Sequence, residues 1–182
     1  KKRDFIMSIK IFSVEGNRQK LDGGAMFGHV PRALWEKWVC PDDIGCIDLS
    51  CRCLLVQLED KLILCETGVG AFFDPKLASR YGVEDVSSNK LIENLKILGF
   101  DPEDIDVIIL SHLHFDHAGG LLTTYKETVS SGEMKIVFPN AKFIVSKEAF
   151  KRAKSPHVRD RVSFIPELPD LLEKSGRLQL IG

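Results

Sequence analysis

The run Val107–Leu110 is wholly apolar, and the ten residues that follow it at 111–120 read SHLHFDHAGG. A short apolar run of this kind predicts a strand that is covered on both faces of its sheet. Three of the five histidines of the chain come directly after it. Open α/β sheets place their chemistry at the carboxyl ends of their strands. We therefore expect a site at the end of this strand.

Strand-like and helix-like segments alternate along the rest of the chain. Strands are expected at 5–14, 47–58, 62–65, 141–145 and 178–181, of which the second and third form a hairpin. Helices are expected at 33–38, 88–100, 146–153 and 168–174. This alternation predicts a layered, mixed α/β domain. A length of 182 residues suits one domain, so residues 1–182 are interpreted as a single domain.

Charge and composition restrict the classes of function. A net charge of −1 lacks the basic excess of nucleic-acid-binding proteins, so no nucleic-acid partner is expected. No stretch approaches the roughly 18 consecutive apolar residues of a membrane span, so no membrane partner is expected. The opening KKRDFIMSIKIF lacks the apolar core and cleavage site of a signal peptide. Together with an odd number of cysteines, five, this favours reduced thiols and a cytoplasmic location.

Four side chains in the histidine-rich segment form a candidate metal site. If the chain stays extended beyond the strand, His112, His114 and Asp116 project to the same side. His117 reaches the same region only if the backbone turns, and the segment Ala118-Gly119-Gly120 permits such a turn. We expect His112 and His114 to serve one divalent ion, and Asp116 and His117 to serve a second. These ligands suit zinc, with iron or manganese as alternatives.

The expected chemistry of such a site is hydrolysis. Two ions about 3.5 to 4 Å apart can share a hydroxide and polarise a carbonyl or phosphoryl oxygen. Asp116 would bind the second ion and is the candidate for proton handling, so it is the predicted catalytic residue. The cluster does not identify the electrophile. A histidine-rich loop that binds no metal is the simpler alternative.

The motif His-x-His-x-Asp-His after a short apolar strand resembles the hallmark of the metallo-β-lactamase superfamily. The segment LLVQLEDKLILCETGVG at 54–70 looks like the hairpin and Asp-Thr-Gly loop of that family, and GGAMFGHVPRALW at 23–35 is similar to the amino-terminal segment of its lactonase-like branch. The resemblance implies an αββα sandwich. It also implies that a hydroxide held by two metal ions attacks a small ester, lactone or related acyl substrate. A phosphodiesterase of the same superfamily and a non-catalytic metal- or partner-binding domain are the alternatives.

The same resemblance suggests roles for residues outside the cluster. Glu66 stands where the family usually has an aspartate that supports a metal ligand through a hydrogen bond. Met26, Phe27 and His29 fall in the segment that borders the pocket entrance in lactonase-like members, so they are candidate substrate contacts. Packing is the alternative role for Met26 and Phe27, and a surface position is the alternative for His29. The implied partner is a small-molecule substrate, and a homo-oligomer is left open.

The family draws its metal ligands from two similar halves, and this chain lacks the later ones. Outside the cluster only His29 and His157 remain, and neither has the sequence context of a ligand. The chain is therefore interpreted as the first half of the sandwich plus a connector, incomplete at its carboxyl end. Two protein ligands per ion fall short of the three that are typical of catalytic zinc. The isolated 182-residue chain is accordingly expected to be weakly active or inactive.

Overall fold

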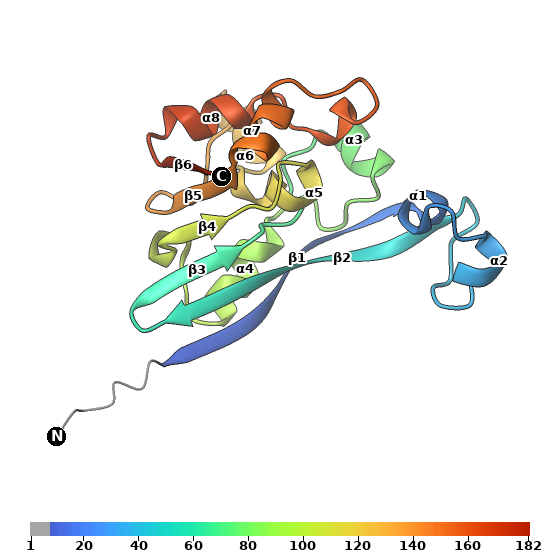
Figure 1. Ribbon diagram of the computed structural model, residues 1–182, viewed down its shortest axis with the longest axis horizontal. Helices are drawn as coiled ribbons and strands as arrows, with labels where there is room; N and C mark the ends of the chain where they lie inside the picture. The colour runs from blue at the N-terminus through green and yellow to red at the C-terminus, as the bar shows by residue number, and fades with distance from the viewer. Residues whose placement is uncertain (1–7) are drawn as a thin grey trace.

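The structure is a computed structural model that describes residues 8–182, and one six-stranded sheet forms its centre (Figure 1). The strands follow one another across the sheet in chain order: β1 (Ile9–Asp22), β2 (Cys46–Leu58), β3 (Lys61–Cys65), β4 (Val107–Ile109), β5 (Lys142–Ser146) and β6 (Leu178–Ile181). The first three strands are antiparallel, and β3 to β6 are parallel. The mixed α/β sheet is thus confirmed. Of the strand expected at 5–14, residues 5–7 lie outside the described residues.

Helices lie between the strands and at the tip of the β1–β2 ribbon. They are α1 (Gly23–Phe27), α2 (Arg32–Trp35), α3 (Pro75–Arg80), α4 (Lys90–Ile97), α5 (Phe115–Ala118), α6 (Tyr125–Ser131), α7 (Lys147–Lys154) and α8 (Leu168–Lys174), with 3-10 turns η1 (Pro102–Asp104), η2 (Gly119–Leu121) and η3 (Arg161–Ser163). The helices expected at 146–153 and 168–174 are confirmed as α7 and α8, and the helix expected at 88–100 is present as the shorter α4. None of the helices in the described part of the chain has the length and apolar character needed to span a bilayer.

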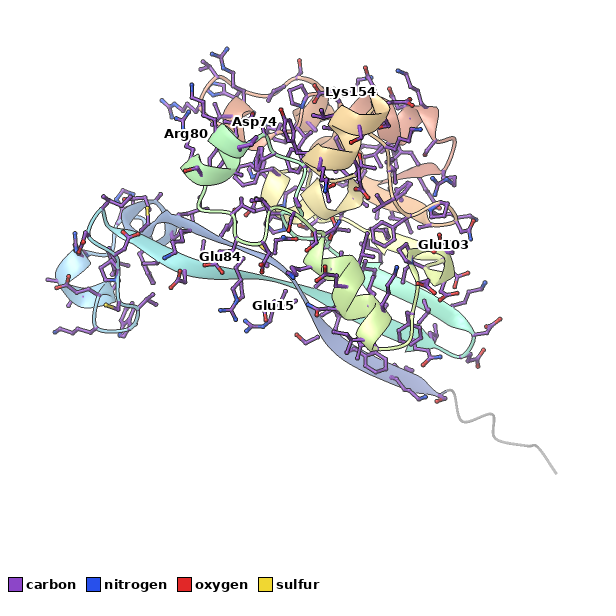
Figure 2. All side chains as sticks on the ribbon, turned by 180° about the vertical axis from the view of Figure 1, so that it is seen from behind. Glu15, Asp74, Arg80, Glu84, Glu103 and Lys154 are labelled. Atoms are coloured by element: carbon purple, nitrogen blue, oxygen red, sulfur yellow. The ribbon has the colours of Figure 1, made fainter. Side chains whose placement is uncertain are left out.

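Four helices, α1, α3, α5 and α6, were not expected from the sequence, although α3 and α6 carry clear local start signals. Asp74 caps α3, where its side chain accepts hydrogen bonds from the backbone N–H groups of the first turn, and Pro75 follows it. Asp74 and Arg80 mark the two ends of α3 in Figure 2. Thr124 begins α6 with a capping box, in which its side chain and that of Glu127 each bond the other's backbone N–H.

One face of the sheet is buried beneath the helices. Its side chains belong to the main hydrophobic core, which includes Leu55, Leu64, Ile108 and Phe143 from the four central strands. Helix α4 packs on β1 and lies in front of the sheet in Figure 2. Removal of this apolar surface from water is the main term that holds the helices to the sheet.

The opposite face of the sheet also carries apolar side chains, but the described residues leave it partly open. The pairing places Ile11 beside Val56 and Val56 beside Ile63. Ile11 is 66% exposed, and Ile109 on β4 is 37% exposed. The expectation that the Val107–Leu110 strand is covered on both faces is therefore wrong: Ile108 is fully buried, but Ile109 faces the open side. Apolar sheet faces of this kind normally pack against a further layer.

Strands β1 and β2 extend beyond the sheet as a long ribbon that carries α1 and α2 at its tip (Figure 1). Asp22 caps α1, because its Oδ1 accepts a hydrogen bond of 2.7 Å from the backbone N–H of Ala25. The rings of Phe27 and Trp35 stack at 5.2 Å and join the two helices. The helix expected at 33–38 is shorter than predicted, since α2 ends at Trp35. We call this projecting ribbon with its two helices, residues 18–50, the arm.

Candidate metal centre

The carboxyl ends of β3 and β4 lie together, because these neighbouring strands run parallel. Glu66 follows β3, and its backbone N–H donates a hydrogen bond of 2.9 Å to the carbonyl of Ile109. The backbone N–H of Ser111, which follows β4, donates to Oε1 of Glu66 at 3.0 Å. Glu66 has a φ of +64°, a left-handed conformation that is uncommon for a residue other than glycine. These contacts hold its carboxylate at the start of the histidine-rich segment.

The first two histidines lie on an extended segment that leaves β4. Leu113, between them, is buried in the core, so His112 and His114 project to the opposite side. Their ring centroids are 4.5 Å apart. The extended segment ends at His114, where α5 begins at Phe115. The expectation that the chain stays extended as far as Asp116 is therefore wrong.

Asp116 and His117 reach the same region from the first turn of α5. Oδ2 of Asp116 lies 3.6 Å from Nε2 of His117, and the ring centroids of His112 and His117 are 4.1 Å apart. Two ligands about 2.1 Å from one tetrahedral ion are about 3.4 Å from each other. The spacing of Asp116 and His117 thus fits a shared ion. The structure brings all four predicted ligands together.

The carboxylate of Glu66 faces the other side of the His117 ring. Oε2 of Glu66 is buried, has no well-aligned hydrogen bond among the described residues, and lies 3.3 Å from Nδ1 of His117. Burial alone would raise the pKa of Glu66, but the contact with His117 and the hydrogen bonds from Ser111 outweigh it and hold that pKa below its usual value. The same contact raises the pKa of His117. Carboxylates orient metal-binding histidines in this way, with the second ring nitrogen left for the ion.

The other two histidines have neighbours that the sequence analysis did not identify. Oγ of Ser111 lies 2.9 Å from Nδ1 of His112, and the ring of Phe164 packs edge-on against His114 at 4.5 Å. Burial, with a further contribution from nearby histidines, lowers the pKa of His112, and burial lowers the pKa of His114. Both rings therefore favour the neutral form that binds metal ions. Ser111 could have been suspected from its position beside His112, whereas no sequence signal links Phe164 to the site.

The glycine pair after α5 packs directly against the loop that follows β3. A Cβ on Gly120 would lie 1.9 Å from the carbonyl oxygen of Thr67, and one on Gly119 would lie 2.2 Å from that of Val69. The expected role of these glycines in turning the chain toward His117 is wrong, because α5 makes that turn before either glycine is reached. Their role is close backbone approach. Thr67 in turn donates to the carbonyl of His117 from its N–H at 2.8 Å and from its Oγ1 at 3.0 Å.

The predicted substrate contacts lie elsewhere in this chain. Met26 and Phe27 belong to α1 and His29 follows it, at the tip of the arm and away from α5 (Figure 1). Met26 and His29 are exposed, and Phe27 stacks on Trp35. The structure does not bring these three side chains to the histidine cluster. His157, the remaining histidine, is also exposed.

The donor set suits borderline divalent ions, since it consists of neutral imidazoles and carboxylates. The buried and unbonded Oε2 of Glu66 beside His117 also fits a histidine that is oriented for metal binding. Among residues 8–182, however, no three histidine, cysteine, aspartate or glutamate side chains are placed to hold a single ion. The chemistry of the four side chains therefore suits divalent ions, but the described part of the chain does not complete a coordination shell.

Comparison with known sequences links the chain to one family. The family model described as the Metallo-beta-lactamase superfamily matches residues 47–129, a range that includes Glu66 and the whole histidine cluster. An N-acyl homoserine lactonase from a Bacillus species is 36% identical over 86 residues, which are 41% of this chain and 33% of the lactonase.

Solved structures share the fold over nearly the whole chain. A probable metal-dependent hydrolase from Staphylococcus aureus, 28% identical, superposes with a TM-score of 0.82 over 95% of this chain and 58% of its own. A dizinc quorum-quenching lactonase in complex with a product, 25% identical, gives a TM-score of 0.65 over 96% of this chain and 58% of its own. Residues 47–129 thus match the metallo-β-lactamase superfamily, and the fold of nearly the whole chain is similar to that of a probable metal-dependent hydrolase. The chain spans 58% of the length of these two structures, and its match covers about a third of the curated lactonase.

Proposed function

We propose that this protein is a metal-dependent hydrolase of lactones and related esters, in which His112, His114, Asp116 and His117 hold two divalent ions, zinc in the first instance. The observation that carries the proposal is the convergence of these side chains at the ends of parallel strands, with Asp116 and His117 at 3.6 Å. The similarity to N-acyl homoserine lactonases supports a lactone as the substrate.

The ions, when bound, supply Lewis-acid activation of water and of the substrate carbonyl. Residues of this chain prepare the site for that chemistry. The carboxylate of Glu66 faces Nδ1 of His117 at 3.3 Å, and Oγ of Ser111 hydrogen-bonds Nδ1 of His112 at 2.9 Å, so both rings are oriented from the Nδ1 side. Asp116 holds a carboxylate oxygen at the site and is our candidate for moving a proton during ester cleavage.

We also propose that the chain forms the first half and connector of an αββα sandwich. Two observations support this. The sheet leaves an apolar face open at Ile11 and Ile109, and within residues 8–182 no three potential ligands are placed around one ion. In this proposal the second sheet and the remaining ligands come from residues outside the present chain.

The test compares substrates on the full-length protein loaded with zinc, manganese or iron. An N-acyl homoserine lactone, a thioester and a chromogenic phosphodiester are assayed side by side, and the lactone is expected to give the highest kcat/KM. Asp116→Asn is expected to lower that value by about 100-fold or more. The substitution weakens the binding of one metal ion and removes the carboxylate proposed to move a proton. His157→Gln is the matched control, since this exposed histidine lies outside the cluster, and it should leave the rate unchanged.

The two alternatives predict different results in the same assay. A phosphodiester that is cleaved faster than the lactone would support the phosphodiesterase. Stoichiometric metal binding without turnover of any substrate would support a non-catalytic metal- or partner-binding domain.

A further inference from the structure

A cavity of about 220 Å³ lies next to the candidate metal centre, where β1 and β2 pass α5. Asp116, His117 and Glu66 line one side of it, and Gln19 of β1 lines another, together with Cys51 and Arg52 of β2. A group that enters this cavity is therefore in contact with two of the predicted metal ligands. Its size suits a polar group of a small substrate rather than a whole ligand, since complete ligand sites occupy about 300 Å³ or more.

Gln19 is a buried amide that the fold does not satisfy. The residue is only 2% exposed, and its Oε1 is buried without a hydrogen-bond partner among residues 8–182. An unpartnered buried group of this kind destabilises the folded chain. The backbone of Gln19 lies in the β1–β2 ladder, where it is paired with Leu49, so only its side chain lacks a partner. Nothing in the described structure offsets the cost of the side chain.

Asn17, two residues earlier on β1, shows what a satisfied amide looks like in the same strand. Its Nδ2 donates to three backbone carbonyls, those of Glu84, Asp85 and Ser88, at 3.0 to 3.2 Å. Its Oδ1 accepts a hydrogen bond of 3.0 Å from the backbone N–H of Lys90. Asn17 therefore ties the strand to the loop before α4. Gln19 has no such structural task, although it is buried almost as completely.

We propose that Gln19 determines substrate specificity, and that the cavity binds a neutral amide group next to the scissile carbonyl of an acyl substrate. A secondary amide offers one donor and one acceptor, and the carboxamide of Gln19 can pair with both. The charges disfavour an anionic group here, because the two carboxylates of Glu66 and Asp116 outnumber the single guanidinium of Arg52. This inference rests on the proposed hydrolase function, and it specifies the kind of ester that the site selects.

The test substitutes methionine, which is apolar and similar in length, for Gln19 in the full-length protein. Two lactones are compared: a γ-butyrolactone with an α-acylamido chain, and one in which methylene groups replace the amide. The wild-type protein is expected to prefer the amide-bearing lactone in kcat/KM. Gln19→Met should reduce this preference by about 10- to 100-fold and leave the alkyl lactone almost unaffected. Gln57→Met is the matched control, because Gln57 pairs with Leu62 at the other end of β2 and does not line the cavity.

Two further measurements do not depend on turnover. Gln19→Met is expected to raise the Tm of the ligand-free protein, because it removes an unpaired buried amide, whereas Gln57→Met should not. The unreactive lactam analogue of the amide-bearing lactone should bind the wild-type protein about 10-fold more tightly than Gln19→Met, as measured by calorimetry.

These results separate the inference from the function on which it rests. If no lactone is hydrolysed but the lactam still binds the wild-type protein more tightly, the hydrolase proposal fails and the specificity of the cavity stands. If Gln19→Met keeps the substrate preference, or if it lowers the Tm, then Gln19 is not a recognition residue and the inference is overturned.

Discussion

Gly120→Ala probes the closest backbone contact at the candidate metal centre. The added Cβ would lie 1.9 Å from the carbonyl oxygen of Thr67, whereas Cβ atoms in proteins essentially never come within 3.0 Å of another heavy atom. The two segments would have to separate by about 1 Å. Gly120 is also fixed by its N–H, which donates to Gly68 at 2.9 Å, and by its carbonyl, which accepts from Nδ2 of Asn89 at 2.8 Å. No side-chain rotation can relieve this clash.

The expected loss in the free energy of unfolding follows from these contacts. Overpacking costs about 1 to 3 kcal/mol even where side chains can adjust. Here a backbone hydrogen bond at Gly120 must also weaken, at a cost of about 1 kcal/mol. We therefore expect a loss of about 3 kcal/mol or more, a large share of the roughly 5 to 15 kcal/mol that stabilises a domain. Because Thr67 bonds the carbonyl of His117, the same displacement should weaken metal binding.

Urea denaturation followed by circular dichroism measures this loss, with Gly132→Ala as the control. Gly132 ends α6 with a φ of +74°, and a Cβ built on it meets no atom within 4 Å. Its substitution should cost about 1 kcal/mol, from the left-handed backbone alone. If Gly120→Ala is no more destabilising than Gly132→Ala, the close approach that we describe does not exist in solution.

Three further predictions concern the metal ligands and the sheet. Glu66→Gln should weaken zinc binding by about 10- to 100-fold, because the negative charge that faces Nδ1 of His117 is lost. Competition with a chromogenic chelator measures this, and an unchanged zinc affinity would contradict the role of Glu66. The isolated 182-residue chain should bind zinc only weakly, since each ion has two ligands, and a calorimetric titration with sub-micromolar affinity at two sites would show otherwise. Lys61 and the backbone N–H of Leu62 hold the pKa of Asp106 below its usual value in the folded protein. The stabilisation that results is present above the unfolded-state pKa of Asp106, and it is lost as the pH falls through the folded-state pKa. Asp106→Asn should therefore reduce the steepness of acid unfolding below about pH 4, and an unaltered pH profile of the unfolding midpoint would count against the contact.

The parts of the fold that sequence reasoning predicted are those in which local pattern and final environment agree. The helix at 168–174 occupies its expected residues, because its leucines lie on one face and glycine follows its end. The hairpin at 47–65 was equally clear, since β-forming residues flank a short polar connection. The four candidate ligands were predicted because they are close together in the sequence.

The remaining features depend on contacts between distant segments. The run Val107–Leu110 reads the same whether its second face lies beneath helices or stays open, so the exposure of Ile109 was not predictable from it. The position of α5 depends on Thr67, a residue 50 positions earlier in the chain, whose N–H and Oγ1 both donate to the carbonyl of His117. Gln19 reads as an ordinary polar residue of an alternating strand, and only the folded chain places it beside Asp116.

The order of strands across the sheet has a consequence for folding during synthesis. Each strand from β2 to β6 pairs with the strand that precedes it in the chain, so the sheet can be assembled in the order in which its strands are synthesised. No strand has to wait for a distant partner, which keeps loop-closure costs low. The contact of Glu66 with the start of the histidine cluster needs only β3 and β4 to be paired, and does not depend on β5 or β6. The four candidate ligands can therefore gather on a nascent chain, and the ring of Phe164 reaches His114 only later.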